Sequence, residues 1–274
     1  MWRIDHASHP EATTTSKITE DAEVDVSPFI SEGGRWLIFA RGRGSRRRIW
    51  MRDNLGSPEV PLTNSGISTR SPIVDKTGDL VAFEQLDRDG SAIYTQIRRA
   101  PAKRICSGCS RPTGWFDTNR GFLFLDGLPS AIKMADPRTG EIRVLLQEIG
   151  ASLSEADWSP SSEYMLFTET RGDRKKMFAV RVPRHSGQVE GPRIPIPDRG
   201  VAPDHPRWSS DGRTVFYLSN SDGFTCIYGQ TFSPERGEVT GAPYAVAHFH
   251  NQRASIDNVF PPSLNLSVDG DSVY

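Results

Sequence analysis

The chain has 274 residues, 36% of them hydrophobic, and its 33 Lys and Arg side chains nearly balance 34 Asp and Glu, for a net charge of −1. This balance gives no overall attraction to a polyanion, so we expect no nucleic-acid partner. Residues 1–6 lack the basic end and apolar stretch of a signal peptide, and no apolar run reaches 18 residues. We therefore expect a soluble, cytoplasmic protein without a membrane partner.

Taken in chain order, one pattern recurs, a polar turn followed by an apolar strand that closes on an aromatic residue. It covers residues 31–39, 75–83, 116–124, 159–167 and 209–217, with a shorter copy at 267–274. The closing aromatic residues are spaced by 44, 41, 43 and 50 positions, and they are Phe39, Phe83, Phe124, Phe167 and Tyr217. A period of about 40 to 50 residues is typical of propeller blades.

Three further strands keep register with this anchor. An apolar residue before each turn predicts a buried first strand, at Ile30, Val74, Trp115, Trp158, Trp208 and Leu266. Third strands are predicted around the pairs 49–50, 93–94, 177–178 and 227–228, and fourth strands at 60–63, 104–106, 142–146, 193–196 and 244–247. The pattern predicts an all-β propeller of four-stranded antiparallel blades at about 25–66, 67–110, 111–150, 151–198 and 199–255, with a partial blade at 256–274.

The repeat, roughly Ser-Pro-Asp-Gly-Arg followed by three apolar residues and Phe, resembles the TolB-type, WD40-like propeller repeat over nearly the whole chain. The resemblance implies the fold but not the function, because such blades occur in periplasmic translocation proteins, prolyl peptidases, polysaccharide lyases and sensor modules. The resemblance also implies that a periplasmic location is an alternative if an upstream segment is missing. Residues 106–115 and 248–250 resemble propellers attached to bacterial regulators and kinases.

The N-terminus is predicted to close the ring. Residues 17–19 match residues 61–63 of a fourth strand, so residues 1–24 would supply the outer strand of the last blade, beside strands from Leu264 onward. This strand exchange protects the edges of a propeller. Because the sequence stops at Tyr274, we expect the third strand of the shared blade to be missing, leaving six blades with an incomplete sixth in a fragment of a longer protein. Residues 13–19 should lie beside the C-terminal strands, directly or across a gap.

The cysteines and two histidines are weak metal candidates. Cys106 and Cys109 have the spacing of a zinc or redox turn, but a structural zinc needs four ligands and no second pair matches. We expect a turn between two blades, with a reversible disulfide as an alternative. His248 and His250 would share one face of an extended strand. Ordinary surface and core alternation also explains them, and we expect neither metal nor cofactor.

A basic run at residues 41–48 occupies the hairpin between second and third strands. Clustered guanidinium groups can bind phosphates. The equivalent hairpins of other blades carry mixed charge, which favours a solvated turn over a nucleic-acid site.

His205 is the best candidate for a binding residue, because it lies just ahead of a predicted first strand, where loops border the channel of a propeller. Blades 1 and 2 have Ser27 and Ser71 at that place, so the repeat does not require a histidine. Asp204, His205 and Arg207 are therefore the candidate ligand-binding residues at the channel mouth. Trp115, Trp158 and Trp208 share one place in the repeat, which favours core packing over carbohydrate binding.

No catalytic residues are predicted, because the sequence has no Gly-x-Ser-x-Gly elbow and no evident acid, base and metal set. We expect a monomeric, non-catalytic module that binds a protein partner or a small ligand at the channel mouth, within a larger bacterial regulatory protein. The alternative is a propeller enzyme or enzyme-associated domain, such as a polysaccharide lyase or the gating domain of a peptidase.

Overall fold

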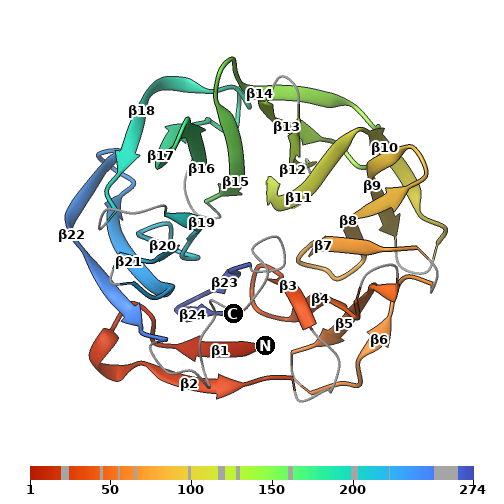
Figure 1. Ribbon diagram of the computed structural model, residues 1–274, viewed down its shortest axis with the longest axis horizontal. Coiled ribbons are helices and arrows are strands. Elements are labelled where there is room, and N and C mark those ends of the chain that lie inside the picture. The colour runs from red at the N-terminus through yellow and green to blue at the C-terminus, as the bar shows by residue number, and fades with distance from the viewer. Residues whose placement is uncertain are drawn as a thin grey trace.

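In the computed structural model, six four-stranded antiparallel sheets form a closed ring around a central axis (Figure 1). The structure describes residues 1–19, 25–43, 46–54, 56–64, 67–97, 100–116, 121–127, 130–159, 163–198, 203–221, 223–249 and 265–274. The all-β, six-bladed propeller that the repeats predict is thereby confirmed.

Five blades are continuous in sequence, and each is built from its inner to its outer strand. Blade 1 consists of β3 (Asp25–Ile30), β4 (Trp36–Arg41), β5 (Arg48–Asp53) and β6 (Val60–Pro61). Blade 2 consists of β7 (Thr69–Val74), β8 (Leu80–Asp87), β9 (Gly90–Ile97) and β10 (Lys103–Ser107). Blade 3 consists of β11 (Cys109–Phe116), β12 (Gly121–Asp126), β13 (Ser130–Ala135) and β14 (Ile142–Glu148).

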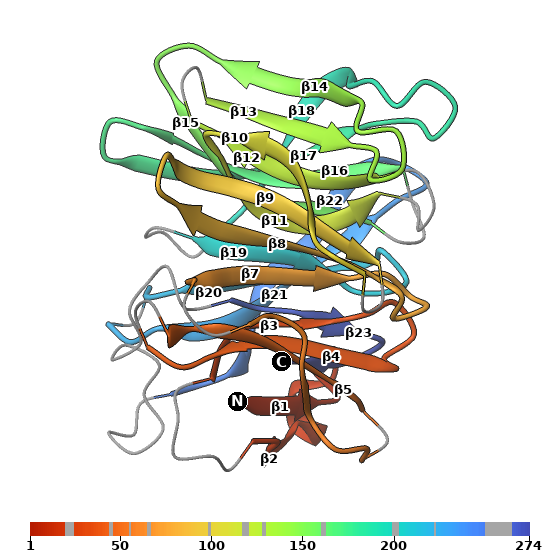
Figure 2. The same ribbon diagram turned by 90° about the vertical axis from the view of Figure 1, so that its right-hand side faces the viewer.

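Blade 4 consists of β15 (Ser152–Trp158), β16 (Tyr164–Arg171), β17 (Arg174–Arg181) and β18 (Glu190–Ile196), and blade 5 of β19 (Asp204–Trp208), β20 (Thr214–Ser219), β21 (Cys226–Ser233) and β22 (Glu238–Ala247). Blade 6 combines both ends of the chain, in the order β23 (Val268–Asp269), β24 (Ser272–Val273), β1 (Trp2–Asp5) and β2 (Thr14–Lys17). A short 3-10 helix, η1 (Pro10–Ala12), lies between β1 and β2. The strands run between the two faces of the ring (Figure 2).

The polar turns after the inner strands explain the repeated sequence pattern. The Ser31 and Ser209 hydroxyls accept hydrogen bonds from the N–H groups of Trp36 (3.0 Å) and Thr214 (2.9 Å). Asp75 accepts the equivalent bond from Leu80 at 3.0 Å. Gly78 has a φ of +80°, and a Cβ there would collide with the Trp36 indole. The Ser or Asp and the glycine of the repeat thus encode the turn itself.

The hydrophobic core lies between neighbouring blades. The five closing aromatic residues that define the repeat are at most 1% exposed. They belong to a series of apolar clusters, each drawn from two adjacent blades, including one that packs Phe39 of blade 1 against Tyr274 of blade 6. Each blade therefore depends on its neighbours for burial, as in other repeat proteins.

Two of the three repeated tryptophans are core residues, as predicted. Trp158 is 4% exposed and packs on Phe116 with ring centroids 4.2 Å apart. Trp208 is 2% exposed and meets Phe232 edge to face at 5.0 Å. Trp115 is half-buried and packs edge to face on Phe122.

The basic run at residues 41–48 differs from the expected solvated hairpin at its ends, since Arg41 belongs to β4 and Arg48 to β5. The Arg41 side chain is 6% exposed, and its guanidinium donates to Asp25 at 2.6 Å and to Glu59 at 2.6 Å. It also stacks over the Trp50 ring, 5.2 Å from its centroid. Arg41 is therefore a structural ion-pair residue rather than an available phosphate ligand.

Ring closure through a blade shared by both termini is confirmed, but the expected gap in that blade is not present. Residues 2–5 form β1, the third strand, which pairs with β24 at Ile4 and Val273 and with β2 at Ile4 and Thr15. The prediction of an incomplete sixth blade was therefore wrong, because only one outer strand was sought at the N-terminus and Ile4 already supplies a buried third-strand position. Residues 14–17 lie one filled strand away from the C-terminal pair.

Within the part of the chain that the structure describes, no helix has the length and apolar character needed to cross a membrane.

Candidate functional site

Five inner strands contain the same backbone distortion. The pairing register of β3, β7, β11, β15 and β19 with the next strand shifts within the inner strand, which marks a β-bulge. At each bulge one non-glycine residue has a left-handed backbone with φ between 45° and 55°, namely Ser27, Ser71, Arg111, Glu155 and His205. Such conformations cost about 1–3 kcal/mol each and concentrate at functional sites, where bulges re-aim side chains.

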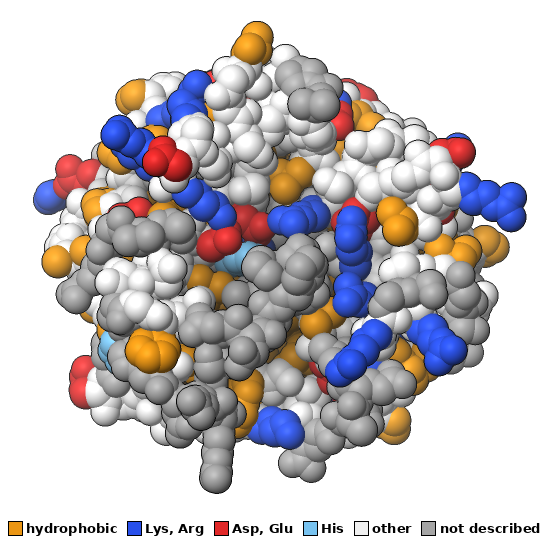
Figure 3. Space-filling model, in the orientation of Figure 1, with side chains coloured by type: hydrophobic (Ala, Val, Ile, Leu, Met, Phe, Trp, Pro, Cys, Tyr) orange, Lys and Arg blue, Asp and Glu red, His pale blue; other side chains and the backbone are white. Residues whose placement is uncertain are grey.

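The five left-handed residues meet on the axis. Together with Pro112, Thr113, Arg207 and Asn265 they line a small cavity of about 30 Å³. On this face of the ring, acidic, basic and histidine side chains gather around the centre (Figure 3). We call Ser27, Ser71, Arg111, Glu155, Asp204, His205 and Arg207 the mouth site.

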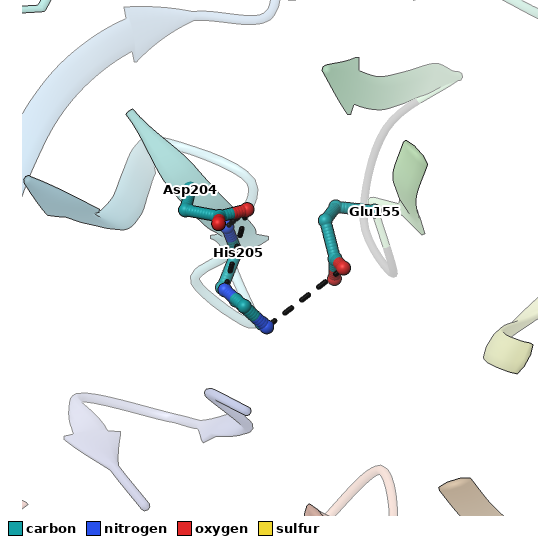
Figure 4. A group of neighbouring side chains, drawn as sticks. All are labelled: Glu155, Asp204 and His205. Carbon is teal, nitrogen blue, oxygen red and sulfur yellow. Dashed lines mark hydrogen bonds and ion pairs between the residues drawn. The ribbon is translucent and has the colours of Figure 1, made fainter. Parts of the chain in front are cut away.

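Glu155 is the centre of the charged half of the mouth site. Its side chain is 7% exposed, and its Oε1 accepts a hydrogen bond from Arg111 Nη1 at 3.0 Å. Oε2 lies 3.4 Å from Arg207 Nη2, and His205 Nε2 lies 3.8 Å from Oε1. Figure 4 shows His205 between Glu155 and Asp204, with Asp204 Oδ1 3.3 Å from Nδ1.

These neighbours determine the ionisation of Glu155. Burial by itself would raise the pKa of this carboxyl group, but the positive charges of His205, Arg207, Arg111 and Lys175 outweigh burial and hold the pKa at about 2. The Glu155 carboxyl group is therefore ionised at mildly acidic and neutral pH.

Arg207 is locked in place by its own hydrogen bonds. Its guanidinium donates to the Leu266 carbonyl at 2.9 Å, to the Pro206 carbonyl at 2.8 Å and to Asn265 Oδ1 at 2.6 Å. The side chain is 6% exposed. Arg207 is therefore held in one position beside Glu155.

Arg111 and Lys175 are the accessible cations of this group. Arg111 has a side chain that is 38% exposed and one bond to Glu155, and its backbone N–H donates to Glu84 at 3.3 Å. Lys175 lies 2.5 Å from Asp204 Oδ1 and is 21% exposed. Without counting His205, the three cations Arg111, Lys175 and Arg207 outnumber the carboxylates Glu155 and Asp204 by one positive charge.

The opposite half of the mouth site is neutral. Ser27 and Ser71 face the same cavity, and neither hydroxyl has a hydrogen-bond partner among the residues the structure describes. Two free hydroxyls facing an exposed guanidinium provide donors for an oxygen-rich ligand group.

Glu155, Asp204 and His205 also form the one group of three potential metal ligands within 4.8 Å of one another in the described part of the chain. One imidazole and two carboxylates suit a divalent transition metal. Each carboxylate, however, already pairs with a fixed cation, Glu155 with two arginines and Asp204 with Lys175. A metal would add two positive charges beside three, so the residues present do not fit one.

The weaker metal candidates lie elsewhere. Cys106 in β10 and Cys109 in β11 form a disulfide with a Cα separation of 6.1 Å, across the connection from blade 2 to blade 3. His248 is exposed after β22, and His250 lies outside the described residues.

Glu155 and Arg111 were not among the candidates from the sequence. Glu155 precedes Trp158 by three residues, as His205 precedes Trp208, so extending the repeat comparison to blade 4 would have found it. Arg111 precedes Trp115 by four residues, because β11 contains a second register shift. That offset is invisible to a comparison by position.

No family model and no curated protein sequence matches the chain. Solved structures, however, are similar to this one. A TolB from Agrobacterium tumefaciens superimposes with a TM-score of 0.69 at 16% identity, over 90% of this chain and 87% of that one. TolB from Acinetobacter baumannii gives 0.57 at 16% identity, over 79% of this chain and 51% of that one. An oligogalacturonate lyase in complex with manganese gives 0.62 at 11% identity, over 89% and 70%.

The protein is thus a six-bladed β-propeller. Its fold is similar to that of the TolB propellers, in agreement with the resemblance of its repeats. At these identities the likeness establishes the fold alone.

Proposed function

We propose that the protein is a non-catalytic binding module that recognises an anionic group, a carboxylate or a phosphate, at the mouth site. The group belongs to a protein partner or a small ligand, and the module serves a larger bacterial regulatory protein as a monomer. The observation that carries the proposal is the set of left-handed residues that five separate blades direct to one point on the axis.

The charge of the mouth site supports an anion rather than a cation. Glu155 and Asp204 are already neutralised by Arg111, Arg207 and Lys175, so the excess charge is positive. Charge-assisted hydrogen bonds from an exposed guanidinium bind carboxylate and phosphate oxygens. The free hydroxyls of Ser27 and Ser71 lie across the cavity to complete the contact.

A catalytic role is less well supported. Glu155 has a pKa of about 2, so it would be a poor general base, and two arginines occupy its oxygens. The lyase neighbour with bound manganese makes metal-assisted catalysis the relevant alternative, and the two predictions that follow separate it from anion binding.

Replacing Arg111 with glutamine is expected to weaken anion binding by roughly tenfold or more, since a hydrogen bond to a charged group contributes about 1.5–3 kcal/mol. Isothermal titration with inorganic phosphate, oligogalacturonate and a hexaglutamate peptide measures this, and the last two probes distinguish a sugar acid from a protein source. Arg143→Gln, at an exposed pair in blade 3, is the control. If no probe binds, or Arg111→Gln binds as the parent does, the proposal fails. Single-stranded DNA at about 150 mM salt should not bind.

The purified protein is expected to bind no divalent metal, because three cations surround the only ligand group in the described residues. Elemental analysis without chelator, and melting temperature with and without millimolar manganese, measure this. One equivalent of metal that disappears in His205→Ala would support the enzyme alternative instead.

The disulfide bears on the cellular compartment in which the protein functions. The N-terminus led us to expect the cytoplasm, whereas disulfides such as Cys106–Cys109 persist mainly in oxidising compartments. We propose that the disulfide is present where the protein functions, which favours a periplasmic or extracellular location.

A further inference from the structure

A second cavity, of about 210 Å³, lies on the same axis. Its lining includes Phe29, Trp115, Trp158, Trp208 and Asp157, which we call the tryptophan pocket. Glu32 and Lys76, in the turns that follow β3 and β7, also line it. Because the mouth-site residues precede these positions along every inner strand, the pocket lies toward the opposite face, with Arg207 bordering both cavities.

Asp157 is an unusual group for such a place. Its side chain is half-buried, and Oδ2 accepts a hydrogen bond from the backbone N–H of Trp208 at 2.8 Å. The other oxygen lies 3.2 Å from where a Cβ of Gly114 would be, so the absence of a side chain at Gly114 leaves space for it. No ion pair within 4 Å joins Asp157 to any residue that the structure describes, although Arg207 is near enough to influence it.

A half-buried carboxylate without a counter-ion loses part of its hydration and gains no opposite charge in return. Burial raises the pKa of Asp157 to about 6, while Arg207 and the backbone N–H groups of Trp208 and Trp158 oppose the rise. Asp157 therefore ionises near neutral pH, and a bound cation would stabilise its charged form.

We propose that the tryptophan pocket binds a small zwitterion, with an organic ammonium group against Asp157 and the half-buried Trp115 indole and an anionic group toward Lys76 and Arg184. Tryptophan is the aromatic side chain that attracts cations most strongly, and aromatic cages are a known way to bind alkylammonium groups. The cavity is smaller than the roughly 300–1,000 Å³ typical of drug-sized ligands. Lys76 and Glu32 are exposed and Arg184 is half-buried, so two positive side chains and one negative side chain border the open side of the pocket.

Matched probes test the charge requirement. Glycine betaine and 3,3-dimethylbutanoate have the same shape and the same carboxylate, but only betaine carries the ammonium charge. Choline has the charge without the carboxylate, and γ-aminobutyrate carries a primary ammonium separated from its carboxylate by two more methylene groups than in betaine. We expect betaine or γ-aminobutyrate to change the tryptophan fluorescence on binding, with 3,3-dimethylbutanoate at least about tenfold weaker and choline intermediate.

The pH dependence has a definite sign. The proposed complex needs ionised Asp157, so affinity should be full above pH 7 and fall as the pH drops through about 6. At pH 5 roughly a tenth of a group with that pKa is ionised, so binding should be about tenfold weaker than at pH 7.5.

Asp157→Asn keeps an oxygen that accepts from the backbone N–H of Trp208 but removes the negative charge. This variant should weaken zwitterion binding at least about tenfold. Glu141→Gln, at an exposed acid in blade 3, should bind as the parent does. If Asp157→Asn does not fold, the paired probes and the pH series still decide. Equal binding of betaine and 3,3-dimethylbutanoate, an affinity independent of pH, or no binding by any probe would overturn the proposal. Because betaine and 3,3-dimethylbutanoate both carry a carboxylate, Arg111→Gln is measured as well, and it should leave betaine binding unchanged if the ligand occupies the tryptophan pocket rather than the mouth site.

Discussion

Removal of residues 1–19 is expected to open the ring and abolish cooperative folding. These residues supply β1 and β2, half of blade 6, and β1 is the strand that joins the C-terminal pair to the outer strand. Ala7 and Ser8 donate to Asp271, at 2.9 Å and 2.6 Å, and Ser272 donates to Asp5 at 2.5 Å. Without them β24 becomes an exposed edge, and two apolar clusters lose a partner. The loss should be comparable with the roughly 5–15 kcal/mol that stabilises a whole domain.

Thermal melting, size-exclusion chromatography and limited proteolysis of the truncated chain measure this. A synthetic peptide of residues 1–19 should restore part of the cooperative unfolding transition.

A finer test uses two residues that face each other across β1 and β2. Ile4 is 2% exposed and pairs with exposed Thr15, so Ile4→Asp should destabilise by several kcal/mol while Thr15→Asp stays within about 0.5 kcal/mol. A truncated chain that melts like the parent would refute the closure by β1.

Trp208→Ala is expected to lower the free energy of unfolding by about 3–5 kcal/mol, because truncating a fully buried aromatic side chain loses its burial and leaves a cavity. Trp208 joins the cluster between blades 4 and 5, where Phe232 and Tyr164 also pack edge to face. Since blades are held together by such clusters, the damage should spread to the interface of the two blades.

Denaturant unfolding followed by circular dichroism measures this effect. Trp2, which is 44% exposed, provides the matched control, and Trp2→Ala should cost less than about 1 kcal/mol. Trp158→Ala should resemble Trp208→Ala, because its indole packs on Phe116 in the cluster between blades 3 and 4. Parent-like unfolding of both variants would place these indoles at the surface and revive carbohydrate binding as their role.

The two cavities on the axis of the propeller differ in their charged groups. Arg207 borders both the mouth site, which has excess positive charge, and the tryptophan pocket, where Asp157 has no ion-pair partner among the residues that the structure describes. Glu155 and Asp157 are two residues apart on β15, yet the pKa of one is about 2 and that of the other about 6. The pKa values differ because His205, Arg207 and Arg111 lie beside Glu155, whereas desolvation dominates at Asp157 and only Arg207 opposes it by charge.

The sequence by itself determined the blades, because a turn and the strand beside it depend on neighbouring residues. Ser209, Gly212 and Tyr217 suffice to predict a turn, a strand and a buried anchor, and their spacing along the chain predicts the ring. His205 was found for the same reason, since comparison of Ser27 and Ser71 with it needs only position in the repeat.

Only the tertiary structure decided which residues meet on the axis. Arg111 and Glu155 are 44 residues apart, and their contact depends on two bulges that shift register without changing the apolar pattern. The third strand of blade 6 was missed because a four-residue strand whose one buried apolar residue is Ile4, beside the exposed Trp2, has too weak a period to recognise. Arg41 was read as solvated because its partner Asp25 comes from the neighbouring strand. In each case the deciding energy comes from contacts between segments distant in sequence, which periodicity along the chain does not record.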